Sequence, residues 1–294
     1  MHLKNLFLTT SLIILAISCS TNNEGSDAFG NFEAETVIVS SESSGKIFRM
    51  NVEKGQEIDR GFVAAVTDTV QLHLKLEQIK AQKEAVNSNK QSIRAQIDIL
   101  EEQKKNLMVD KKRVEDMVKD GAATQKKLDD INGQIAVIEK QIAHTKTQIT
   151  SVDKELNVLG TQQQATEDML NRCTIVSPAN GTVLETYMEQ GELASPGKPV
   201  FKMADLEEMI LKVYVTGAQL PDIRIGQKVK VIVDKNAKEN QSFEGKITWI
   251  SSEAEFTPKI IQTKEERVKL VYAVKVKLQN DGTLKIGMPG EIRW

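Results

Sequence analysis

Two stretches of this sequence share one pattern. "SGKIFRMNVEKGQEIDRG" runs from Ser44 to Gly61, and "NGTVLETYMEQGELASPG" runs from Asn180 to Gly197. In each copy three glycines are separated by ten and then six residues, and we expect them to mark turns: Gly45, Gly55, Gly61, Gly181, Gly191 and Gly197. The repetition predicts two halves of one small β sandwich, related by a pseudo-twofold axis.

Between the copies the hydrophobic period changes from that of strands to seven residues. In the first arm the repeat runs from Leu72 to Val114, and in the second from Leu128 to Leu170. Each residue of the repeat is followed by a second seam position, four residues later in the first arm and three residues later in the second. Six of these second positions hold lysine or threonine: Lys83, Lys90, Lys104, Lys111, Thr145 and Thr166. This heptad pattern predicts a coiled coil in which lysine stems cover the seam.

The heptads stop at "KDGAATQ", where Gly121 suits a helix end and Thr124 suits the cap of the next helix. Two arms of about 50 residues around a short turn predict an antiparallel helical hairpin about 75 Å long. Gly133 and Gly160 should weaken the second helix locally. Such a hairpin leaves and returns to one place, so the two β halves can pair across its base.

The N-terminus has the pattern of an export signal. An apolar run from Leu6 to Ile17 is too short for a stable membrane span and ends at Ser18 and Cys19, which resembles a bacterial lipoprotein signal. We therefore expect lipid on Cys19, although an ordinary secretory signal with a chance cysteine is the alternative. The second cysteine, Cys173, is expected to be a small buried apolar residue.

Composition and spacing argue against chemistry. Aromatic residues are 4% and charged residues 27% of the chain, and the net charge of −2 gives no electrostatic footprint for nucleic acid. The histidines, at positions 2, 73 and 144, lack metal-ligand spacing, and the paired glycines do not precede a helix. We expect no enzymatic activity, cofactor, metal or nucleic-acid partner.

The arrangement resembles that of the HlyD-family periplasmic adaptor subunits, or membrane fusion proteins. Residues 177–209 resemble the second half of the lipoyl-like domain of that family, 223–234 and 243–251 its barrel, and 284–292 its closing strand. "AEFTPKIIQTKEER", from Ala254 to Arg267, resembles adaptors of ABC-type exporters. The resemblance covers nearly the whole chain after the signal.

The resemblance implies an elongated α+β fold in which a biotinyl/lipoyl-like β domain is split by the helical hairpin. A β-barrel and a β membrane-proximal domain follow. The expected divisions are a signal peptide (1–18), a lipid-anchored flexible tether (19–32), a first membrane-proximal strand (33–40), a first lipoyl-like half (41–67), the hairpin (68–172), a second half (173–204), the barrel (205–256), and C-terminal strands that close the barrel and form the membrane-proximal domain (257–294).

The implied function is to link an inner-membrane transporter, preferably ABC-type, to a TolC-like outer-membrane channel for export of small molecules or drugs. The family also implies a homo-oligomer, usually a hexamer. A lipid on Cys19 would hold it on the periplasmic side of the inner membrane of a Gram-negative bacterium.

Adaptors that dock onto TolC-like channels carry an Arg, a Leu four residues on and a Ser seven beyond that. This sequence has Arg113, Met117 and Thr124 at that spacing, and two of the three are substitutions. An arginine fork can bind carbonyls or carboxylates of a partner helix, and an apolar side chain can insert between its residues. The alternative is that Arg113 is one charge on a solvated face and Thr124 only a helix cap.

Two other functions compete with this interpretation. A biotin or lipoyl carrier would present a lysine between the β halves, but here the hairpin occupies that position. A purely structural coiled-coil lipoprotein would not need the repeated β phrase or the long C-terminal β region.

Overall fold

The computed structural model describes residues 26–236, 239–256 and 270–294. The signal, Cys19 and most of the stretch from Ala254 to Arg267 lie outside the described residues. The described residues divide into two compact units, one within Ile38–Lys202 and one within Met1–Val37 and Met203–Trp294. Each unit is described by itself.

The first unit contains a sandwich of two four-stranded sheets. Its strands are β2 (Thr36–Ser40), β3 (Gly45–Met50), β4 (Glu57–Ile58), β5 (Val63–Thr67), β6 (Thr174–Val176), β7 (Gly181–Thr186), β8 (Leu193–Ala194) and β9 (Pro199–Ala204). The orders are β2-β9-β7-β4 and β6-β5-β3-β8. Each sheet therefore takes one strand from each copy of the repeated phrase, β4 and β7 or β3 and β8, and two strands from the flanking sequence. The two sheets are equivalent strand by strand.

Backbone hydrogen bonds repeat between the two copies. The Gly55 N–H donates to the Val183 carbonyl at 2.8 Å, and the equivalent Gly191 N–H donates to the Ile47 carbonyl at 2.9 Å. Their φ angles are +88° and +98°, a conformation that glycine adopts without the steric cost of a Cβ atom. All six glycines of the repeated phrase have positive φ, with values that match between the copies.

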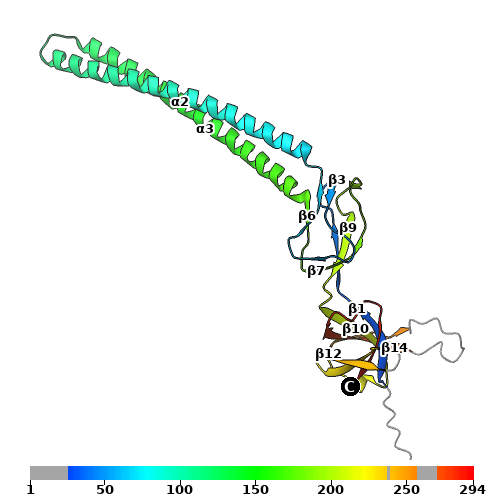
Figure 1. Cartoon of the computed structure of the whole chain (residues 1–294). Helices are drawn as coiled ribbons and strands as arrows, with labels where there is room; N and C mark the ends of the chain where they lie inside the picture. Colours follow the sequence, from blue (N-terminus) through cyan, green and yellow to red (C-terminus); the bar gives the residue numbers. More distant parts are fainter. Residues whose placement is uncertain (1–25, 237–238, 257–269) are drawn as a thin grey trace, which may run out of the picture. The chain divides into compact units, whose positions relative to one another are not determined.

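The hairpin consists of α2 (Val70–Lys119) and α3 (Gln125–Arg172), which lie side by side in Figure 1. Every seam position of the two heptad repeats is buried or half-buried in the structure. The buried ones are Leu76, Ile79, Ile97, Ile131, Ile142, Thr145, Val152, Leu159, Thr166 and Cys173. The predicted antiparallel coiled coil is thus confirmed residue by residue.

Most of the seam lysines contact a polar side chain of the other helix. Three of them pair across to the other helix: Lys83 donates to the Gln163 side chain at 2.8 Å, Lys90 pairs with Asp153, and Lys104 with Glu139 at 2.7 Å. The Lys104 ammonium hydrogen-bonds to the Glu139 carboxylate and attracts it, which lowers the pKa of Glu139. These contacts place polar groups of one helix opposite partners on the other, so they favour a single register.

The second unit is a closed six-stranded barrel with one further short strand. Its strands are β1 (Ala28–Glu33), β10 (Glu208–Thr216), β11 (Lys228–Asp234), β12 (Asn240–Ile250), β13 (Glu255–Phe256), β14 (Leu270–Gln279) and β15 (Pro289–Arg293), with a short 3₁₀ helix at Leu220–Asp222. The ring β10-β1-β15-β11-β12-β14 closes because β10 pairs with β14 as well as with β1. Phe32, Leu211, Val231, Val276 and Ile292 are fully buried in its core.

Strand β1 differs from the expected division at the N-terminus. The residues 28–32, which we assigned to the tether, already belong to this strand, whereas β2 pairs with β9 in the sandwich. The inward positions of β1 are Ala28, Gly30 and Phe32, and the small residues hide the alternation of a strand. Gly30 approaches β10 so closely that a Cβ atom would overlap the Lys212 carbonyl oxygen.

Two glycines of the hairpin provide a matched test of this backbone. Gly121, between the helices, has φ +73°, whereas Gly133 lies within α3, and a Cβ atom at either position would meet no neighbour. We expect Gly121→Ala to destabilise the hairpin by about 1–2 kcal/mol and Gly133→Ala to stabilise it by about 1 kcal/mol. Thermal unfolding followed by circular dichroism at 222 nm would measure both. Equal shifts for the two variants would contradict the described turn.

Candidate docking site at the hairpin tip

The turn between α2 and α3 satisfies its own backbone. The Ala122 N–H donates to the Met117 carbonyl at 2.7 Å, and the Gly121 N–H donates to the Val118 carbonyl at 3.1 Å. With Gly121 in the left-handed conformation, these bonds form a Schellman motif. The end of α2 therefore needs no side chain from elsewhere to cap it.

Thr124 is the N-cap residue of α3, as the sequence predicted. Its backbone is extended, at φ −92° and ψ 150°, and its hydroxyl accepts a hydrogen bond from the Lys127 N–H at 3.4 Å. The side chain is exposed although it caps the helix. A partner could therefore contact Thr124 without breaking into a packed core.

Arg113 and Met117 lie one turn apart on the same face of α2. The Arg113 side chain is 70% exposed, and within the described part of the chain its ion pair is with Asp110, at 3.3 Å on the same helix. Such an exposed pair contributes little stability, so the guanidinium can change partners at low cost. Met117 is 42% exposed. The pair thus presents a fork of N–H donors beside an apolar side chain.

The three predicted residues are not joined into one cluster by direct side-chain contacts among those described. Arg113 and Met117 share a helix face, and Thr124 lies across the turn whose first hydrogen bonds end on the Met117 carbonyl. The sequence reasoning did not single out Met108 and Val109, which lie about two turns before Met117 on α2 and are 54% and 56% exposed. Their signal was available, because both are large apolar residues outside the seam positions.

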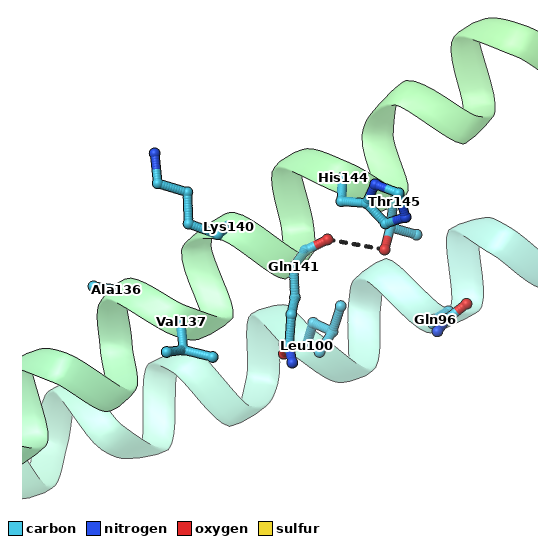
Figure 2. A pocket seen from close by; sticks show the side chains of 8 residues that line it. All are labelled: Gln96, Leu100, Ala136, Val137, Lys140, Gln141, His144 and Thr145. Carbon is cyan, nitrogen blue, oxygen red and sulfur yellow. Dashed lines mark hydrogen bonds between the residues drawn. The ribbon is translucent and has the colours of Figure 1, made fainter.

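A groove between the helices, away from the tip, is the other candidate site in the hairpin. Figure 2 shows Leu100 and Val137 in its lining, with His144 at its edge. The Thr145 hydroxyl donates to the Gln141 carbonyl at 2.9 Å, within α3. The groove lacks the convergent acid, base and nucleophile that catalysis requires.

The described residues offer little else that could carry chemistry or cross a membrane. No group of three or more histidine, cysteine or acidic side chains among them is placed to hold a metal ion. No helix in the described ranges is long and apolar enough to span a bilayer. Cys173 is a free, buried thiol, as the sequence indicated.

Comparisons with known sequences match parts of the chain. The family described as "LcnD-like, C-terminal domain" matches residues 205–293. A UPF0194 membrane protein of Acidithiobacillus ferridurans is 36% identical over 116 residues, which cover 39% of this chain and 34% of that protein. The chain thus spans about a third of the length of the curated relative.

Solved structures match over a larger share. The alignment with the crystal structure of MacA from Actinobacillus actinomycetemcomitans covers 90% of this chain and 76% of the MacA chain, at 20% identity and a TM-score of 0.57. The alignment with the membrane fusion protein Spr0693 from Streptococcus pneumoniae R6 covers 90% of this chain and 96% of the Spr0693 chain, at 13% identity and a TM-score of 0.51. At such identities the likeness shows the fold alone. The chain has the fold of the periplasmic adaptor, or membrane fusion, proteins, with a split β domain, a helical hairpin and a barrel.

Proposed function

We propose that this chain is a lipid-anchored periplasmic adaptor of an export system. Its barrel unit contacts an inner-membrane transporter, preferably of the ABC type, and its hairpin tip docks onto a TolC-like outer-membrane channel. Cys19 carries the lipid, and several copies, usually six in this family, surround the conduit for small molecules or drugs. The chain itself does no chemistry; it couples its partners.

The presentation of Arg113 and Met117 is the observation that carries this proposal. The turn is capped by backbone bonds to the Met117 and Val118 carbonyls, so neither of the two side chains is needed to hold the tip together. Arginine can bind backbone carbonyls or carboxylates with two parallel N–H groups, and methionine adapts to irregular apolar holes. These are the chemistries required to bind the end of another coiled coil.

The preference for an ABC transporter depends on the resemblance of residues 254–267, most of which lie outside the described residues. The split domain could instead have belonged to a lipoyl carrier. However, β5 leads into α2 and α3 leads into β6, so a 105-residue hairpin (68–172) occupies the position of a carrier lysine. No observation favours the carrier function over the adaptor.

Photo-cross-linking in cells from position 117 tests the docking site. We expect mass spectrometry to identify an outer-membrane channel protein among the products from position 117. Val158 is 57% exposed on α3, away from the tip, and a probe there serves as the matched control. Products from position 117 that contain only this chain or soluble proteins would contradict docking at the tip.

A negative charge placed at position 113 or 117 should abolish docking without unfolding the hairpin. We expect Arg113→Glu and Met117→Asp each to eliminate co-purification of the captured channel, because the donor fork and the apolar contact are lost. Arg94→Glu, at an exposed site of the same helix, and Val158→Asp are the matched controls. Far-UV circular dichroism and cellular protein level should stay unchanged in all four. Retention of the channel by both tip variants would remove Arg113 and Met117 from the site.

The lipid anchor is tested by separate variants. We expect Cys19→Ser to release the protein from the membrane fraction, because a hydroxyl cannot form the thioether to diacylglycerol. Cys173→Ala, at the buried cysteine, is the control and should leave fractionation unchanged. Mass spectrometry of the N-terminal peptide should show a diacylglycerol-modified Cys19 in the wild type. Full membrane retention of Cys19→Ser would contradict the anchor.

A further inference from the structure

The outer face of the barrel carries a contiguous patch of aromatic and lysine side chains. Strand register pairs Phe29 of β1 with Tyr214 of β10, Lys212 of β10 with Lys275 of β14, and Lys275 with Trp249 of β12. Register partners point to the same face of a sheet, and so do residues two apart on one strand. We call these five residues the aromatic–lysine patch: Phe29, Lys212, Tyr214, Trp249 and Lys275.

Within the patch each lysine lies against an aromatic ring. The Lys212 ammonium is 5.4 Å from the centroid of Tyr214, and the Lys275 ammonium is 5.5 Å from that of Trp249. Glu255 lies 3.6 Å from Lys212 and neutralises one of the two charges. Two further carboxylates share this outer face, because Glu291 of β15 is the register partner of Phe29 and the charge of Glu33 acts on Lys212. The patch therefore has no excess of positive charge, and its lysines contribute ammonium groups held beside aromatic faces.

The barrel does not need these rings for its own core. The residues that fill its interior alternate with the patch along the same strands, and they include Leu211, Val213, Val274 and Val276. Phe29 nevertheless remains 58% exposed and Trp249 41% exposed. Aromatic residues are only 4% of the chain, so their collection along the outer side of the consecutive strands β1, β10, β14 and β12 is not a consequence of composition. An exposed apolar patch of this kind marks an interaction surface.

The covalent structure places this patch close to the proposed anchor. Nine peptide units separate Cys19 from Ala28, the first residue of β1, and they cannot reach further than about 30 Å. Phe29 is the second residue of that strand. Trp249 lies three strands from β1, or about 15 Å away at the usual strand spacing. If Cys19 carries a lipid, the whole patch is within reach of the bilayer surface.

We propose that the aromatic–lysine patch is a binding surface for phospholipid headgroups, which holds the barrel against the membrane that carries its anchor. Trp and Tyr rings prefer the headgroup level because one edge is polar and the body is apolar. Lysine stems lie along apolar surface while their ammonium groups reach phosphates. The inference rests on the lipid anchor of the proposed function. A single lipid chain gives weak anchoring, and a second membrane contact strengthens it.

A tryptophan quenching experiment tests this surface without any transporter present. The chain has two tryptophans, so Trp294→Phe leaves Trp249 as the only one. The full lipoprotein is purified from membranes and reconstituted into phosphatidylethanolamine/phosphatidylglycerol vesicles, with or without bromine on the acyl chains near the headgroups. We expect the fluorescence of Trp249 to fall about twofold in brominated vesicles, as for a ring at the membrane interface. Adding Lys275→Glu should restore most of the signal.

A matched control moves the reporter to another exposed aromatic site. Phe48, in β3 of the other unit, is 72% exposed. The variant with Trp249→Phe, Trp294→Phe and Phe48→Trp should show no quenching. Equal quenching of the reporters at positions 48 and 249 would overturn the proposal, because binding would then not be specific to the patch.

The remaining outcomes separate this inference from the proposed function. If the protein stays on the vesicles through its lipid but Trp249 is not quenched, the patch is not a lipid surface, and the anchor and the docking tip stand. If Cys19 carries no lipid, both the anchor and this inference fail, and docking at the tip is unaffected.

Discussion

The hydrogen bond from the Thr67 N–H to the Cys173 carbonyl, 2.9 Å long, joins residues 106 positions apart and closes the base of the hairpin. The Thr67 hydroxyl donates to the same carbonyl at 3.3 Å, and both residues are almost fully buried. Because β5 and β6 are adjacent antiparallel strands, the chain must return beside the point that it left. The two helices must therefore be antiparallel and of nearly equal length. Because the base of the hairpin is closed, the strands before the hairpin can pair with the strands after it. Neither set of strands could form the two sheets alone.

The seam of the hairpin shows what this arrangement requires of the helices. A continuous apolar seam would be more stable, but it would fit several registers nearly as well. The cross-helix contacts of Lys83 with Gln163, Glu101 with Lys146 and Lys104 with Glu139 follow one antiparallel register, because one residue number rises as the other falls. A shift by one heptad would separate all of these partners, and polar seam residues are known to specify register in coiled coils. The register in turn determines which residues lie at the tip.

The sequence alone predicted the features that have a local period. The heptads identified every seam position, and the spacing of the glycines identified two equivalent β halves. It did not predict that β1 begins at Ala28, because Gly30 and Asn31 look like tether residues until Lys212 and Val213 are placed beside them. At the tip, the four-residue spacing placed Arg113 and Met117 on one face, whereas their exposure required the structure. The aromatic–lysine patch was beyond prediction, because Phe29 and Trp249 come together only through pairings of strands far apart in the chain.

The two surfaces that we propose as contacts with partners would suit an adaptor for the same physical reason. At the tip, backbone bonds to the Met117 and Val118 carbonyls complete the turn, and in the barrel the inward residues complete the core. In both places the exposed side chains are therefore surplus to folding and are held on rigid backbone. A surface of this kind loses little conformational freedom when it binds, so even a small contact can contribute net affinity. A protein that only couples other components needs such preformed contacts, and it does not need strained or titrating groups, which are typical of catalytic sites.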